Sequence, residues 1–175
     1  MKTKIWLLIG AVLSVAGCNG RRDDAAKVSS ADRDFVTAAT QANFSESDLG
    51  RLAKKKAENT DVKRFGQHMI NDHDVANAEL GNLAGKKGIP VPKEADADQQ
   101  KTAARLSELE GAAFDRRYME VMVDDHLKAV ALFELRSLQT GDAEIKAFAE
   151  KSLPMLRRHL TMARDVFSKV GGHTP

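Results

Sequence analysis

The strongest constraint on the fold is a helical repeat of apolar residues that continues through most of the chain. From about residue 31 the sequence is rich in Ala, Leu and charged residues. Its apolar residues return every three or four positions, and no convincing stretch alternates between apolar and polar residues. This spacing places apolar side chains on one face of a helix. The roughly 158 residues after position 17 suffice for one domain with a real core, so the sequence predicts an all-α domain.

Caps, glycines and prolines divide this domain into four long helices and a short one. The predicted long helices cover about 31–58, 60–88, 112–139 and 142–170, and a weaker helix covers about 99–110. Pro90 and Pro92 end the second helix, because proline lacks the backbone donor and restricts the residue before it. The segment 88–111 is long enough to run back along the bundle. This predicts a ferritin-like four-helix bundle with a long crossover containing the short helix, and simple up-down topology is the alternative.

The N-terminus has the layout of a bacterial lipoprotein signal. Basic residues at Lys2 and Lys4 precede an apolar run of about a dozen residues, which is too short to span a bilayer as a helix. Val15-Ala16-Gly17-Cys18 resembles a lipobox, and Cys18 is the only cysteine in the chain. We therefore expect residues 1–17 to be a signal peptide, Cys18 to carry the lipid, and 18–31 to be a polar tether. Asn19 is compatible with outer-membrane sorting in a Gram-negative cell, so the domain is expected to face the periplasm.

The charge balance argues against a nucleic-acid partner. The chain has 27 Lys+Arg and 25 Asp+Glu, and loss of residues 1–17 removes Lys2 and Lys4, which leaves formal neutrality. A neutral domain with few aromatic residues has neither the basic surface nor the stacking platforms that nucleic acids need. Residues 171–175 are expected to form a flexible tail, and the membrane, reached through the lipid, is the expected partner.

Each predicted long helix carries at least one ionisable residue on or beside its apolar face. They are Glu46 on the first helix, His73 on the second, the neighbours Asp125 and His126 on the third, and His159 on the fourth. Buried charged groups are normally paired or bound to metal. With the rise of a helix and the crossover topology, Glu46, His73, His126 and His159 lie within about one turn of each other, near the middle of the bundle.

This cluster has two interpretations. One is a metal site in which Glu46, His73, His126 and His159 are ligands, since imidazole with carboxylate suits zinc, iron or copper. Residues that could orient these ligands or replace one of them are Asp72, Asp125, Tyr118, Met122 and Met155, and the two thioethers would favour Cu⁺. The other is a buried hydrogen-bonded network that fixes helix register. The sequence contains no recognisable catalytic motif, so a binding or structural module is favoured over a metal-dependent redox or hydrolytic enzyme.

The pattern of these residues resembles a known family. Residues on all four long helices are similar to the pattern of the bacterial domain of unknown function family 4142. They are Phe35, Glu46 and Gly50, the run Val62-Lys63-Arg64-Phe65, Asp72-His73, Phe114-Asp115 with Tyr118 and His126, and Leu153-Pro154 with His159-Leu160. The resemblance covers about residues 32–168. It implies a ferritin-like bundle in the cell envelope, often labelled an outer membrane protein, and no established reaction. Di-iron bundles carry Glu-x-x-His motifs, but Ile70 and Leu156 occupy the Glu positions here, so iron oxidation is not expected.

Overall fold

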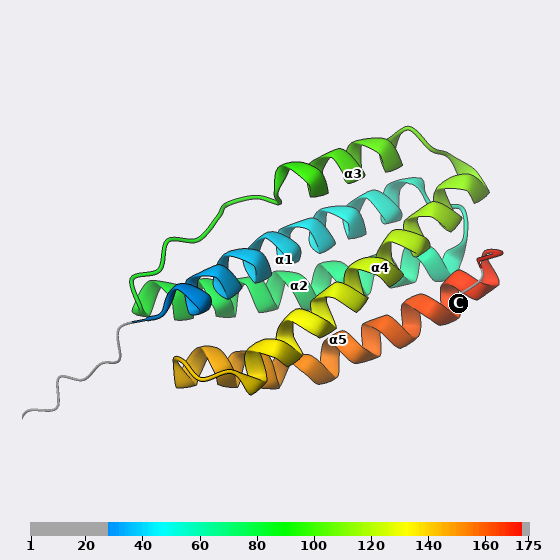
Figure 1. Cartoon of the computed structure of the whole chain (residues 1–175). Helices are drawn as coiled ribbons and strands as arrows, with labels where there is room; N and C mark the ends of the chain where they lie inside the picture. The colour runs from blue at the N-terminus through cyan, green and yellow to red at the C-terminus, as the bar shows by residue number, and fades with distance from the viewer. Residues whose placement is uncertain (1–27, 173–175) are drawn as a thin grey trace, which may run out of the picture.

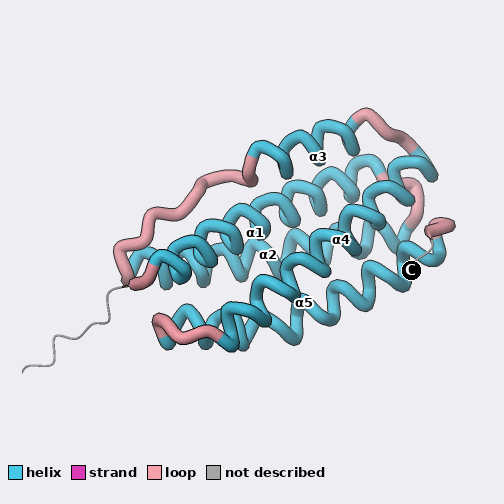
Figure 2. Tube along the Cα trace, viewed as in Figure 1, coloured by secondary structure: helices cyan, strands magenta, loops and turns pink. Residues whose placement is uncertain are grey.

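The computed structural model describes residues 28–172, and all regular structure in this part of the chain is helical (Figures 1 and 2). The expected signal peptide, Cys18, most of the tether and residues 173–175 lie outside the described residues. The helices are α1 (Ser30–Lys56), α2 (Thr60–Lys86), α3 (Ala97–Ser107), α4 (Gly111–Leu138) and α5 (Ala143–Lys169). The predicted all-α class is therefore confirmed, and each predicted helix is present. Among the described residues, none of the helices is both long and apolar enough to cross a bilayer.

Four of the described helices, α1, α2, α3 and α5, begin at a side-chain cap. Ser29 is the N-cap of α1, and Asp32 completes a capping box with it. Residues 30 and 31 of the expected tether are thus helical. Asn59, Asp96 and Asp142 cap α2, α3 and α5 by accepting hydrogen bonds from backbone N–H groups of the first turn.

The topology is that of a ferritin-like bundle. Helices α1 and α2 form one antiparallel hairpin, and α4 and α5 form the other. In Figure 1 the segment after α2 runs back along the length of the bundle, and α3 lies on this crossover beside α1 and α4. Helices α2 and α4 consequently run in the same direction. The crossover, rather than simple up-down topology, therefore connects the two hairpins.

Two apolar clusters fill the bundle on either side of its middle. One includes Phe65, Phe114 and Tyr118, and the other includes Phe35, Phe133 and Phe148. At the hairpin of α1 and α2, the backbones approach closely through two glycines. A methyl group added at Gly50 would lie 2.6 Å from the Gly66 carbonyl oxygen, and one added at Gly66 would lie 2.9 Å from the Gly50 carbonyl oxygen. The absence of side chains at both positions is what allows this contact.

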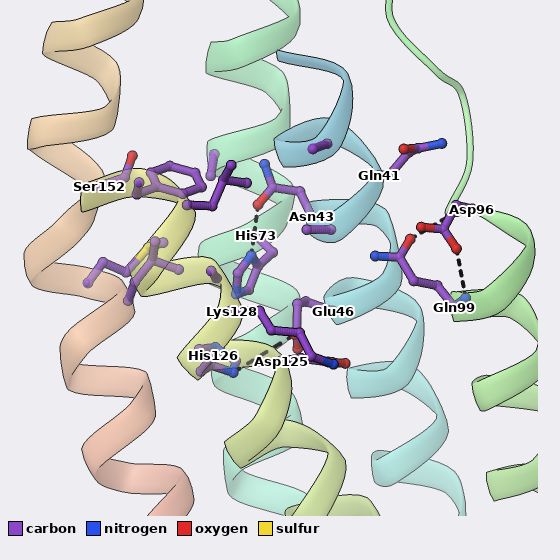
Figure 3. Close-up of a pocket in the computed structure, with 18 of the residues that line it drawn as sticks. Gln41, Asn43, Glu46, His73, Asp96, Gln99, Asp125, His126, Lys128 and Ser152 are labelled. Atoms are coloured by element: carbon purple, nitrogen blue, oxygen red, sulfur yellow. Dashed lines mark hydrogen bonds and ion pairs between the residues drawn. The ribbon is translucent and has the colours of Figure 1, made fainter. Parts of the chain in front are cut away.

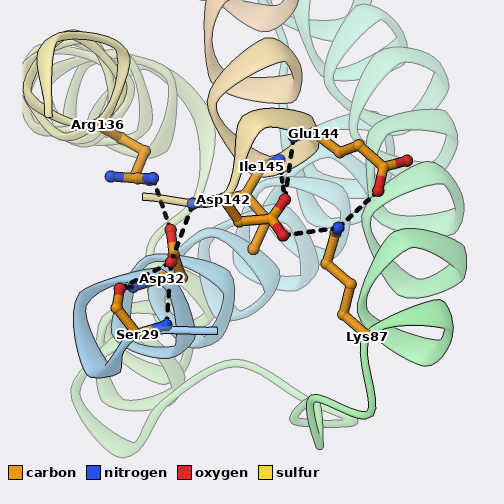
Figure 4. Close-up of polar contacts among 7 residues, drawn as sticks. All are labelled: Ser29, Asp32, Lys87, Arg136, Asp142, Glu144 and Ile145. Carbon is orange, nitrogen blue, oxygen red and sulfur yellow. Dashed lines mark hydrogen bonds and ion pairs between the residues drawn. The ribbon is translucent and has the colours of Figure 1, made fainter. Parts of the chain in front are cut away.

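A buried ion pair joins the helix ends at the bundle end where α1 begins (Figure 4). Arg136 Nη2 of α4 lies 2.6 Å from Asp32 Oδ1 of α1, and both side chains are almost fully buried. The Asp142 backbone N–H donates to Asp32 Oδ2. Lys87, just after α2, donates to Asp142 Oδ2 at 2.7 Å and to Glu144. These contacts, which we call the end clasp, connect all four long helices.

The end of α5 differs from the expected tail. The Gly172 N–H donates to the Phe167 carbonyl oxygen at 2.9 Å, and the Gly171 N–H donates to the Ser168 carbonyl oxygen. These bonds satisfy carbonyl groups that would otherwise be left free at the end of the helix. The first two residues of the predicted tail are therefore part of the folded domain.

Candidate metal centre

Three histidines from three helices meet in the middle of the bundle. One ring nitrogen each of His73 on α2, His126 on α4 and His159 on α5 lies within 4.8 Å of the other two. The ring centroids are 5.8, 5.4 and 5.4 Å apart. All three side chains are almost fully buried. Their predicted convergence is thus present, because the crossover topology places these positions at one level.

Each imidazole is held by the protein through one ring nitrogen. His126 Nδ1 donates to the Met122 carbonyl oxygen at 2.8 Å, and His159 Nε2 donates to the Asp72 carboxylate at 2.8 Å. His73 Nδ1 lies 2.9 Å from the Asn43 side-chain oxygen (Figure 3). The opposite nitrogens, His73 Nε2, His126 Nε2 and His159 Nδ1, are buried and have no hydrogen-bond partner among the described residues. With a proton on the bonded nitrogen, each free nitrogen carries a lone pair.

The surroundings keep these rings neutral. Burial lowers the pKa of His126 to about 4, with a further contribution from His159. Burial, followed by the charges of His126 and His159, lowers the pKa of His73 well below its usual value. Burial also lowers the pKa of His159, against the opposing effect of Asp72. Neutral imidazole is the form that binds metal.

The separation of the rings is close to that of a three-histidine metal site. Three atoms at most 4.8 Å apart share a centre at most roughly 2.8 Å from each, whereas a Zn–N bond is about 2.0–2.1 Å. An inward movement of each nitrogen by at most about 0.7 Å would therefore produce bonding distances. Outer partners such as Asn43, the Met122 carbonyl and Asp72 match the groups that normally orient metal-bound histidines.

Glu46 on α1 lies beside the three histidines. Its Oε1 is 3.8 Å from His126 Nδ1, and its Oε2 is buried without a hydrogen-bond partner in the described part of the chain. Burial and then the charge of Asp125 raise the pKa of the Glu46 carboxyl well above its usual value. The Tyr118 hydroxyl is also buried and unpartnered, and burial and Glu46 raise its pKa. Glu46 therefore lies on the Nδ1 side of His126, and it is not among the side chains whose ligand atoms meet between the three helices.

The remaining predicted residues lie farther out. Asp72 contacts His159, while Asp125 is half-buried and accepts a hydrogen bond from Lys128. Met122 is buried in the core, and its backbone rather than its thioether holds His126. Met155 lines a neighbouring cavity. Sequence reasoning missed Asn43, whose amide holds His73. Its signal was its spacing, since it lies three residues before Glu46 on the same helix.

A cavity of about 260 Å³ adjoins the histidines. His73, His126 and Glu46 form its inner end, and Phe133, Phe148 and other apolar residues form its walls. Asp96 and Gln99, at the start of α3, lie over its outer side together with Asp125 (Figure 3). A metal ion held by the three histidines would therefore face this space.

Comparisons with known proteins agree with this architecture. The profile of the family described as "Domain of unknown function (DUF4142)" matches residues 19–166. The chain belongs to this family. The DUF4142 chain is also similar in structure to the solved "DUF305 fragment from Deinococcus radiodurans", with a TM-score of 0.71 and 15% identity over 81% of this chain and 98% of that one. At this identity the likeness shows a common fold alone. A comparison with curated proteins found no match.

Proposed function

We propose that this DUF4142 protein binds one transition-metal ion through His73, His126 and His159. The observation that carries the proposal is that three buried imidazoles each have one nitrogen held by the protein and the other nitrogen unpartnered. A network whose purpose was to fix helix register would pair its buried polar atoms, because an unpaired one is costly. Here the unpaired buried atoms include one lone-pair nitrogen of each of the three imidazoles, and these are the atoms that would bind the metal.

Glu46 is proposed as a fourth ligand that turns toward the ion when it binds, because its buried Oε2 has no partner of its own among the described residues. Metal binding favours its carboxylate form in the same way that it favours neutral imidazole. Three nitrogens and one oxygen suit Zn²⁺, Fe²⁺ or Cu²⁺, and the backbone role of Met122 weakens the case for Cu⁺. Iron oxidation by two metals is not proposed, since the site has one carboxylate beside three histidines.

Metal loading tests this proposal. The purified protein is stripped with chelator and then loaded with Zn²⁺ or with Co²⁺ as a spectroscopic substitute. We expect one ion per chain and a higher melting temperature, since a ligand at a hundredfold excess over its Kd stabilises by about 2.7 kcal/mol. His73→Ala, His126→Ala and His159→Ala should each abolish loading. His68→Ala is the matched control, because His68 is exposed on α2. A folded protein that takes up no metal would contradict the proposal and leave the buried network as its explanation.

The cavity supports a second function, in which the metal is catalytic. A metal beside a cavity keeps a position for water or substrate, as catalytic zinc sites do. In this version Glu46 is the acid or base rather than a ligand. The loaded protein should then hydrolyse 4-nitrophenyl acetate, and Glu46→Gln should remove this activity while the metal content is unchanged. Absence of turnover by the loaded protein would contradict hydrolysis.

We also propose that Cys18 anchors the domain to the outer membrane and that the domain faces the periplasm. The lipobox-like run Val15-Ala16-Gly17-Cys18 and the single cysteine support this. Mass spectrometry of the detergent-extracted protein should find an acylated N-terminal cysteine. Cys18→Ser should leave an unprocessed, unlipidated chain, and Asn19→Asp should move the protein to the inner membrane if sorting follows that residue.

A further inference from the structure

The cavity beside the histidines is apolar along most of its wall. Ala42 on α1, Ala129 and Phe133 on α4, and Phe148 and Leu156 on α5 all line it. Polar residues are also present, among them Asp96, Gln99 and Asp125 at the outer side of the cavity. Its volume of about 260 Å³ exceeds the roughly 150 Å³ that suffices for a benzene molecule in an apolar protein cavity. Size and lining therefore fit an organic molecule of about one ring.

The inner end of the cavity is polar and incompletely paired. Asn43 and Glu46 are about 5% exposed, and the Asn43 amide nitrogen and Glu46 Oε2 have no hydrogen-bond partner among residues 28–172. Both side chains line the cavity next to His73 and His126 (Figure 3). Asn43 Nδ2 is a donor, so it requires an acceptor atom on whatever occupies the inner end.

The charge at the inner end favours an anionic group once a metal ion is bound there, whereas Asp96 and Asp125 place negative charge at the outer side. A divalent ion bound by three neutral imidazoles would bring two positive charges into a buried site. Glu46 compensates one of them when ionised. A second negative charge from a bound molecule would complete the balance, and buried charges are stable only when they are compensated.

Resting on the proposed metal site, we infer that the cavity binds a small organic acid with an apolar body of about one ring. One carboxylate oxygen coordinates the metal, and the other accepts a hydrogen bond from Asn43 Nδ2. The apolar body lies against Phe133 and Phe148, below the start of α3.

Titration of the Co²⁺-loaded protein tests this inference, with benzoate as the probe and acetate as its counterpart without the ring. Benzoate should change the visible Co²⁺ spectrum and bind at least about tenfold more tightly than acetate, because the ring is removed from water. Ala129→Leu and Ala42→Leu fill the cavity and should weaken benzoate binding at least about tenfold by overlap with the ring. Ala131→Leu adds the same side chain at an exposed position of α4 and should leave benzoate binding unchanged.

The outcomes separate this inference from the metal proposal. A normal Co²⁺ spectrum that benzoate does not alter overturns the organic-acid site and leaves the metal site intact. Equal affinity for benzoate and acetate would show that benzoate binds outside the cavity. Equal weakening of benzoate binding by Ala129→Leu and Ala131→Leu would show the same. Either result overturns the organic-acid site. Failure to bind Co²⁺ overturns both proposals. The Co²⁺ spectrum of each variant, recorded before titration, shows whether its metal site is formed. If Ala129→Leu does not fold, Ala42→Leu takes its place as the cavity-filling variant.

Discussion

Asp72 orients one of the proposed metal ligands from the outside. Its carboxylate accepts a hydrogen bond from His159 Nε2, which leaves His159 Nδ1 as the metal-binding nitrogen. Removing such an outer partner typically costs about 10–100-fold in metal affinity. Asp72→Ala should therefore raise the Kd for Zn²⁺ by that factor, as measured by competition with a chelating dye, without abolishing binding.

The control for this prediction is Asp165→Ala, which removes an exposed carboxylate from α5. It should leave the Kd for Zn²⁺ unchanged. If Asp72→Ala binds Zn²⁺ as tightly as the unaltered protein does, the Asp72–His159 contact has no part in positioning the ligand.

At the level of single residues, the sequence predicted which side chains meet but not how each is bonded. His73, His126 and His159 stand out because they are ionisable residues on apolar helix faces. The rotamer of each ring and its hydrogen-bond partner decide which ring nitrogen is free. For His126 this partner is the backbone carbonyl oxygen of Met122. The spacing of apolar residues contains no information on these contacts, so only the structure shows which ring nitrogens have no partner among the described residues.

At the level of elements, the contact between α1 and α2 depends on two glycines. Alanine normally stabilises a helix by about 0.5–1 kcal/mol relative to glycine. At Gly50, however, a methyl group would collide with the Gly66 carbonyl oxygen at 2.6 Å. Gly50→Ala should therefore destabilise the protein by about 1–3 kcal/mol, measured by urea unfolding. Gly81→Ala should have the opposite sign, because nothing lies within 4 Å of a methyl group there. Stabilisation by both variants would contradict the close approach.

The buried face of α1 explains why Asn43 was not predicted as a site residue. Its buried positions 32, 36, 39, 43, 46, 50 and 53 follow a strict four-three alternation, which is the spacing of a coiled-coil seam. Several of these residues are polar or small, including Asp32, Asn43 and Gly50. Apolar residues alone therefore do not reveal the whole seam. The spacing itself carries the signal, and it would have placed Asn43 beside Glu46.

At the level of the whole molecule, the topology followed from the length of one connection. The stretch 88–111 is long enough to return along the bundle, and Pro90 and Pro92 prevent it from continuing α2. The returning connection makes α4 run in the same direction as α2. As a result, His73 and His126 lie at the same height along the bundle. The end clasp could not be predicted in this way, because Asp32 and Arg136 are 104 positions apart and neither belongs to an apolar pattern.

The end clasp should contribute strongly to stability. Asp32→Asn leaves the buried Arg136 guanidinium without its counter-ion, and breaking a buried pair costs about 3–5 kcal/mol. Asp34→Asn is the matched control, since Asp34 is exposed on the same helix. Urea unfolding of the metal-free protein at pH 7 should show this loss for Asp32→Asn and almost none for Asp34→Asn. Equal midpoints for the two variants would mean that the pair contributes nothing to stability.

The same clasp predicts how stability changes in acid. Burial opposes ionisation of Asp32, but hydrogen bonds from Ser29 and the Asp142 N–H, together with Arg136, hold the pKa of its carboxyl below the usual 3.8. Burial also opposes ionisation of Asp142, but the Lys87 hydrogen bond and charge, together with the Ile145 and Glu144 N–H groups, lower its pKa. The unfolded chain therefore binds more protons as the pH falls below about 4. The stabilisation is complete above that pH and is lost as the pH falls through the folded-state values. Between pH 5 and pH 2.5, the urea midpoint of the metal-free protein should fall less steeply for Asp32→Asn than for the unaltered protein. Parallel curves of urea midpoint against pH for the two proteins would exclude Asp32 as a source of acid sensitivity.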